Sequence, residues 1–179
     1  TVTMLATEML LAAGMKVSAG GNLGMPALDL LEAEAPDIYV LELSSFQLET
    51  THTLAPVSAV VLNISEDHMD RYGDLAEYKS AKLRIYSNAE NIVVNRDEIH
   101  LRSLLSASEN SLSFGLDRPP GACDFGVAGT GKNRSLVAGS QVLAKVSEMT
   151  LQGDQNIANV LAAMALVKSA GVELGTPAI

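Results

Sequence analysis

Two largely apolar runs, each followed within two residues by acidic side chains, constrain the fold of this chain more than any other feature. The runs cover residues 38–41 and 57–64. Neither run alternates between apolar and polar side chains, which is typical of strands in a parallel sheet that helices cover on both faces. Helical patterns alternate with strand patterns along the chain. We therefore expect an α/β fold with a mostly parallel sheet flanked by helices.

Periodicity and chain breakers locate the other elements. The expected helices cover residues 1–13, Pro26 to about Glu34, 74–88 and 155–170, with Asp154 as the N-cap of the last, and the expected strands cover 15–19, 37–43, 57–64 and 91–95. From about residue 110, short apolar stretches are broken by Gly, Pro, Asn and Asp. This texture predicts a small antiparallel β-hairpin region.

The bulk composition excludes several classes of protein. The chain has 179 residues, of which 47% are apolar, so it can bury the core of one domain. Its net charge of −9 argues against nucleic-acid binding, because that affinity rests on neutralising phosphates. The single cysteine, Cys123, allows neither an internal disulfide nor a thiolate zinc site. No apolar run reaches the roughly 18 residues that a membrane-spanning helix needs. We expect a cytoplasmic monomer without a membrane partner.

The acidic residues that follow the two apolar runs are candidate metal ligands. Glu42 follows the first run, whereas Glu66, Asp67, His68 and Asp70 follow the second. Ligands gather at the carboxyl ends of strands in open α/β sheets, and we expect these two strands to be neighbours whose ends form one cage. Mg²⁺ takes one or two protein carboxylates and completes its shell with water and substrate phosphates. Taken alone, Glu42 is more simply interpreted as a solvated carboxylate at a strand end, and the second cluster as the start of a helix.

Lys82 is an unexpected residue on the helix expected over residues 74–88. A helical wheel places it close to the centre of the apolar side, with Leu75, Tyr78 and Tyr86. One interpretation is snorkelling, in which the stem packs and the ammonium reaches water. The other is a lysine held near the metal site, where its protonation or chemistry can change. Periodicity does not choose between them.

A glycine-rich stretch from Gly126 to Lys132 has the spacing of a phosphate-binding loop. Asn133 stands where that loop needs Ser or Thr, and no helical pattern follows. We interpret this stretch as a hairpin turn.

Four segments together resemble the Mur ligase family, and the resemblance runs through essentially the whole chain. It is strongest in residues 20–28, 41–49, 66–72 and 81–86. The family has an N-terminal UDP-binding domain, a central ATPase domain and a C-terminal domain that helps to bind the amino acid. The resemblance implies that residues 1–179 are the central domain alone, cut just after the phosphate loop, whose last threonine Thr1 matches.

The resemblance also assigns roles to individual residues. Glu42 and His68 resemble Mg²⁺ ligands, Lys82 resembles a lysine that CO₂ carbamylates so that it can hold a second Mg²⁺, and Lys82 and His68 are the catalytic candidates. Asn22, Ser44 and Gln47 resemble residues near the substrate, while Thr1 and Asn156 resemble residues on the ATP side. Gln155 replaces the histidine of the family motif, which puts that residue's contact with ATP in doubt.

The implied activity is ATP- and Mg²⁺-dependent amide formation in peptidoglycan synthesis. ATP would phosphorylate the carboxylate of UDP-N-acetylmuramoyl-L-alanine, and D-glutamate would then attack the acyl phosphate. The alternatives are another Mur ligase or a folylpolyglutamate synthetase relative, which the string Phe46 to Glu49 disfavours, and a metal-dependent phosphohydrolase, which the shortage of histidines disfavours. We expect the isolated chain to be inactive, as a non-catalytic piece of the fold.

Overall fold

The strands of the protein form two sheets in the computed structural model, which describes residues 1–32, 34–67, 69–106 and 111–173. In the smaller sheet, β1 (Val17–Gly21) pairs in parallel with β2 (Ile38–Glu42). The larger sheet has the order β3 (Ser58–Val61), β4 (Asn91–Asn95), β5 (Ser111–Phe114), β6 (Phe125–Ala128), β7 (Ser135–Ala138) and β8 (Gln141–Lys145). The expected α/β class is confirmed, because β3 to β6 run parallel and β6 to β8 form antiparallel hairpins.

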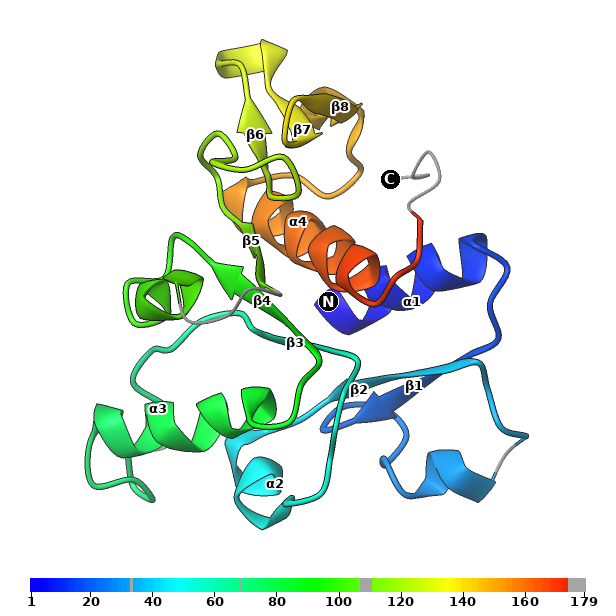
Figure 1. The fold of residues 1–179 in the computed structure, drawn as a ribbon, viewed down its shortest axis with the longest axis vertical. Helices are drawn as coiled ribbons and strands as arrows, with labels where there is room; N and C mark the ends of the chain where they lie inside the picture. Colours follow the sequence, from blue (N-terminus) through cyan, green and yellow to red (C-terminus); the bar gives the residue numbers. More distant parts are fainter. Residues whose placement is uncertain (33, 68, 107–110, 174–179) are drawn as a thin grey trace.

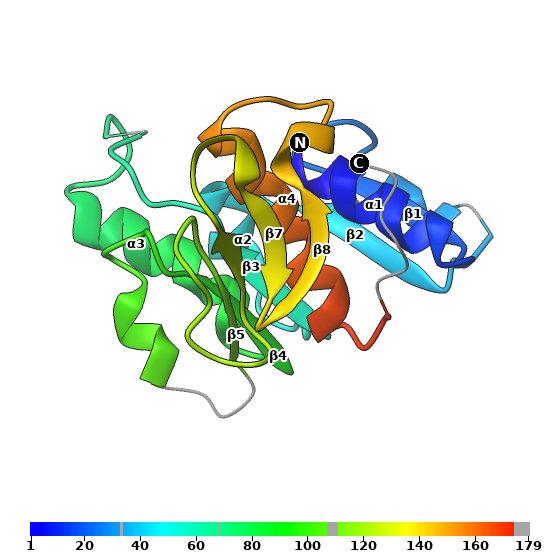
Figure 2. The same cartoon turned by 90° about the horizontal axis from the view of Figure 1, so that it is seen from above.

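Helices cover both faces of the larger sheet. On one face lies α4 (Asp154–Ser169), and α1 (Val2–Ala12) packs beside it against β1 and β2 of the smaller sheet (Figures 1 and 2). On the other face lies α3 (Leu75–Leu83), next to the short helix α2 (Ser45–Thr50). The strand β4 shows the consequence, because Val93 packs in the core cluster beneath α4 while Ile92 and Val94 pack in the cluster beneath α3.

The strand β2 departs from the expected burial on two faces. Val40 packs in the α1 and α4 core cluster, but Tyr39 and Leu41 on the other face are 37% and 36% exposed. Among the described strands, β2 pairs only with β1 and β3 pairs only with β4. The strands that carry the two acidic clusters are therefore not paired neighbours, and each keeps one open edge.

The segment from Pro26 to Glu34 is not the expected helix. Its described part contains a single 3₁₀ turn, Asp29–Glu32. Leu28 and Leu31 within it are 77% and 65% exposed, so most of its apolar face is not packed against the described residues. An α-helix in a protein is held mainly by the packing of such a face, which explains why none forms here.

Two smaller expectations also need correction. The N-cap of α4 is Gly153, and Asp154 is the first residue of the helix, where it pairs with Arg134 at 2.7 Å. The helix α3 ends at Leu83 and continues as a 3₁₀ turn, Arg84–Tyr86. The hairpin expected from Gly126 to Lys132 is confirmed, although Gly126 to Ala128 belong to β6 and the turn to β7 begins at Gly129.

The phenol of Tyr86 ties β3 to β4, which predicts a measurable loss of stability for Tyr86→Phe. The hydroxyl accepts from the Val61 amide at 2.7 Å and donates to the Val93 carbonyl at 2.9 Å, and burial raises its pKa. Its removal leaves two backbone groups unpaired, so local opening should become easier by about 1–3 kcal/mol. Hydrogen exchange at the Val61 amide measures this, with the exposed Tyr39→Phe as the control that should change nothing.

Candidate functional site

Glu42 lies at the carboxyl end of β2, where three elements meet. Its Oε2 accepts a hydrogen bond from Thr3 Oγ1 at 3.0 Å, in the first turn of α1. Its backbone carbonyl accepts from the Asn22 amide at 2.6 Å, just after β1. Within the described residues, Oε1 has no hydrogen-bond partner. The carboxylate is half-buried, with one oxygen held and the other open to a ligand.

The loop after β1 fits around Glu42 because Gly21 has no side chain. Gly21 has a φ of +120°, and a Cβ there would lie 2.2 Å from the Glu42 carbonyl oxygen. The Gly21 amide also donates to the Met25 carbonyl at 2.8 Å, which closes the loop. The glycines at this strand end therefore position Asn22 against Glu42, two residues that sequence analysis assigned to substrate and metal.

Lys82 lies near the end of α3, against the residues that follow β3. Its Nζ donates to the Asn63 carbonyl at 2.9 Å and lies 4.9 Å from the ring centroid of Tyr78. Lys82 is half-buried, and its ammonium takes a cation–π position over the Tyr78 ring. No hydrogen bond or ion pair joins Lys82 to Glu42 in the part of the chain described.

The two acidic segments meet through side chains that the metal hypothesis did not use. Phe46 stacks on Tyr72 with centroids 6.1 Å apart, and the Arg71 guanidinium lies 4.9 Å above the Phe46 ring. Arg71 also pairs with Glu49, which lowers the pKa of that carboxyl. His68, the candidate ligand in this segment, lies outside the described residues.

Ser44 and Gln47 have a local structural role that the sequence analysis did not foresee. The Ser44 hydroxyl accepts from the Gln47 amide at 3.3 Å, and Gln47 Oε1 accepts from the Ser44 amide at 2.8 Å. This reciprocal pair is a capping box that starts α2. The Ser44 hydroxyl and Gln47 Oε1 are therefore already engaged in the hydrogen bonds that cap the helix.

The two residues expected on the ATP side lie at helix starts. Thr1 is the N-cap of α1, without a hydrogen bond from its side chain to the helix. Asn156 lies in the first turn of α4 and donates through Nδ2 to the Gln152 carbonyl at 2.8 Å. The structure joins neither of them to Glu42 or Lys82 through a hydrogen bond among the described residues.

The unpartnered carboxylate oxygen of Glu42 suits a hard divalent cation. Mg²⁺ prefers oxygen ligands and keeps several water or phosphate ligands of its own. The described residues contain no group of three His, Cys, Asp or Glu side chains that could hold a metal. This arrangement fits an ion that takes one protein carboxylate here and receives other ligands from a nucleotide.

The sequence of residues 1–167 matches the model of the Mur ligase middle domain. The chain belongs to the Mur ligase family. UDP-N-acetylmuramoylalanine–D-glutamate ligase of Shewanella oneidensis is 47% identical over 173 residues, which cover 97% of this chain and 38% of that protein. The enzyme of the same name from Pasteurella multocida is 49% identical over 175 residues, again 97% of this chain and 38% of that protein. The chain thus spans well under half the length of these Mur ligases.

Solved structures of Mur ligases and their relatives share the fold. A pseudomurein peptide ligase type C from Methanothermus fervidus superposes with a TM-score of 0.73 at 16% identity, over 96% of this chain and 44% of that one. MurF from Acinetobacter baumannii gives a TM-score of 0.73 at 21% identity, over 97% and 41%. Among the described residues, no helix has the length and apolarity to cross a membrane.

Sequence analysis missed Thr3 and Asn63, and it placed Tyr78 on the same side as Lys82 without predicting their contact. Thr3 and Asn63 carried no local signal, because their partners are 39 and 19 positions away along the chain. Tyr78 lies one turn before Lys82, and this spacing of four places an aromatic face beneath a lysine on a helix. That signal was present in the sequence of this Mur ligase domain.

Proposed function

We propose that this chain is the ATPase domain of a ligase that adds D-glutamate to UDP-N-acetylmuramoyl-L-alanine, using ATP and Mg²⁺. The similarity to D-glutamate ligases over 97% of the chain carries this proposal. In this reaction the substrate carboxylate attacks the γ-phosphorus of ATP, ADP leaves, and the amine of D-glutamate then displaces phosphate from the acyl phosphate. The product is an amide, with ADP and phosphate released.

The proposed roles follow from where each side chain lies. Glu42 would hold Mg²⁺ through its open oxygen, and Asn22 beside it would face the substrate. His68 would be a second ligand, and Lys82 would leave the Tyr78 ring once carbamylated and so become an anion. A bound Mg²⁺ neutralises charge on the transferring phosphoryl group. Thr1 and Asn156 would contact ATP from the starts of α1 and α4.

Ser44 and Gln47 retain a proposed role near the substrate through the segment that they cap. The capping box fixes the start of α2 immediately after Glu42 and leaves Gln47 Nε2 as a possible donor. The substrate would then be read by the end of this rigid segment. We therefore assign this role to the position of the segment that begins α2 as well as to its side chains.

We propose that a phosphate loop precedes Thr1 in the complete ligase, together with UDP-binding and amino-acid-binding domains. The open edges of β2 and β3 support this, because an unpaired strand edge is a template for another strand. The exposed Leu23, Met25, Leu28 and Leu31 would be covered by those domains. Without the loop, the isolated chain should bind ATP weakly and make no product.

The reaction is tested with the complete ligase and four amine acceptors. ADP release is followed with ATP, Mg²⁺ and UDP-N-acetylmuramoyl-L-alanine, with D-glutamate, L-glutamate, L-lysine or diaminopimelate added in turn. We expect release only with D-glutamate, together with one new amide in the product. Release with another acceptor would assign a different ligase, and phosphate release without any amine would indicate a hydrolase.

A further inference from the structure

We propose that Thr3 is a positioning residue that orients the Glu42 carboxylate toward the divalent cation. The inference rests on the proposed function, because it gives a role to a cation at Glu42. Thr3 Oγ1 donates to Glu42 Oε2 at 3.0 Å, across 39 positions of sequence. With Oε2 engaged, the oxygen left for a cation is Oε1, which has no hydrogen-bond partner among the described residues. One hydrogen bond thus selects which oxygen meets the cation.

The donor in this contact is itself rigid. Thr3 lies in the first turn of α1, whose residues Val2, Ala6 and Leu10 are buried in the core. Thr7 Oγ1 donates to the Thr3 carbonyl at 2.8 Å, a bond to the helix backbone that leaves the Thr3 hydroxyl for Glu42. Threonine is also stiff at χ1, because two heavy atoms branch at its Cβ. The hydroxyl is therefore held in place before any ligand arrives.

The acceptor is held from the opposite side. The Asn22 amide fixes the Glu42 carbonyl at 2.6 Å, and only a glycine at position 21 allows that approach. The carboxylate therefore has its main chain fixed by the loop after β1 and its side chain fixed by α1. Groups that orient a metal ligand in this way change metal affinity when they are removed. If the hydrogen bond from Thr3 to Glu42 only joined α1 to β2, its loss would change the free energy of unfolding and leave cation affinity unchanged.

The test compares Thr3→Val, Thr3→Ser and Thr7→Val in the complete ligase. Valine keeps the shape and removes the hydroxyl, serine restores the donor, and Thr7→Val removes a similar half-buried hydroxyl one turn away that contacts only the backbone. The first readout is Mn²⁺ affinity in the presence of ADP, by electron paramagnetic resonance. The second is the Mg²⁺ concentration that gives half the maximal rate, with the KM for D-glutamate as the comparison.

We expect Thr3→Val to weaken Mn²⁺ binding and to raise the half-saturating Mg²⁺ concentration by about tenfold. The KM for D-glutamate should stay the same, Thr3→Ser should recover most of the loss, and Thr7→Val should match wild type. In a Glu42→Gln background, Thr3→Val should have no further effect, because the oriented charge is gone. Circular dichroism confirms that each variant is folded.

Unchanged Mn²⁺ affinity in folded Thr3→Val would overturn the inference, as would an equal loss in Thr7→Val. The two proposals fail separately, because Mn²⁺ binding does not require turnover. A wild-type protein that binds Mn²⁺ through Thr3 and Glu42 but forms no amide would keep the inference and remove the proposed reaction. A ligase that forms the amide but whose Mn²⁺ affinity does not change in Thr3→Val would keep the proposed reaction and remove the inference.

Discussion

Glu42→Gln in the complete ligase should lower turnover by roughly a hundred- to a thousandfold, the usual cost of losing one group that stabilises charge in a transition state. The substitution keeps the size of the side chain and one oxygen for Thr3, but removes the charge that would meet the cation. The affinity for UDP-N-acetylmuramoyl-L-alanine should change much less, so the loss should appear in kcat. Steady-state kinetics at saturating Mg²⁺ measures it.

The matched control for this prediction is Glu8→Gln on α1. Glu8 is an exposed carboxylate with no ion pair among the described residues, and it should keep the wild-type rate. A thermal melt of both variants separates lost chemistry from lost folding. Near-normal kcat in folded Glu42→Gln would remove Glu42 from the site.

Lys82→Ala should lower turnover as much as Glu42→Gln does, and added bicarbonate should not restore it.

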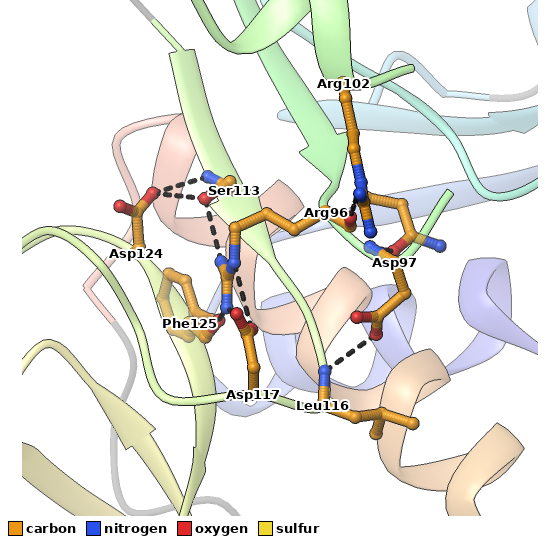
Figure 3. A network of polar contacts seen from close by, with 9 residues as sticks. Arg96, Asp97, Arg102, Ser113, Leu116, Asp117, Asp124 and Phe125 are labelled. Carbon is orange, nitrogen blue, oxygen red and sulfur yellow. Dashed lines mark hydrogen bonds and ion pairs between the residues drawn. The ribbon is translucent and has the colours of Figure 1, made fainter. Parts of the chain in front are cut away.

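Arg96→Met should destabilise the domain by about 1–3 kcal/mol, because it leaves the buried partners of the guanidinium without their donor. The side chain of Arg96 is only 8% exposed. It reaches Asp117 Oδ1 at 2.6 Å, Ser113 Oγ at 2.8 Å and the Phe125 carbonyl at 3.0 Å, as Figure 3 shows. Methionine fills similar space but donates to none of them.

The network matters because β5 and β6 are otherwise joined weakly. Their described pairing is a single register pair, Phe114 with Phe125. Arg96 bridges the two strands, since Ser113 lies on β5 and Phe125 on β6, and Asp124 Oδ1 holds the Ser113 hydroxyl at 2.7 Å. Loss of the guanidinium should therefore free the hairpin region from the parallel sheet.

Native-state hydrogen exchange on the β6 amides measures this effect, with Arg134→Met as the control. Arg134 pairs with the exposed Asp154 at 2.7 Å, and a pair of that kind contributes about 0–1 kcal/mol. The two variants make the same chemical change at a buried arginine and at a half-buried arginine whose partner is exposed. Equal exchange rates in both would show that the network does not hold the strands together.

The sequence predicted the elements that are defined by their own residues. The strand at residues 91–95 was located to the residue, because Ile92, Val93 and Val94 face two cores. The helix at 155–170 was located to within a residue at each end, because a long Ala- and Leu-rich pattern is strongly periodic. These local signals needed no knowledge of the tertiary structure.

The predictions that were wrong depended on partners far away in the chain. Pro26 and the leucines after it carry a helical pattern, but the surface that would bury them is not among the described residues. The two apolar runs were correctly read as strands, yet their placement as neighbours depended on a pairing that no local pattern records. Ser44 and Gln47 show the converse, because their spacing of three is a capping signal that the family resemblance overshadowed.

The candidate site was predictable as a set of residue types but not as contacts. Glu42 was found because ligands gather at the carboxyl ends of strands and a second acidic strand end was expected opposite it. Thr3 and Asn63 became visible only when the fold brought α1 to β2 and α3 to the end of β3. The central claim is therefore spatial: Glu42 and Lys82, on separate elements, serve one magnesium pocket together with His68.

The most direct test is a crystal structure of the complete ligase with Mn²⁺, ADP and UDP-N-acetylmuramoyl-L-alanine, read at the manganese absorption edge. The account predicts an anomalous peak at about 2.1–2.3 Å from a Glu42 carboxylate oxygen, with His68 and the modified Lys82 turned toward the same pocket. An anomalous peak with no oxygen of Glu42 in its coordination shell would contradict it.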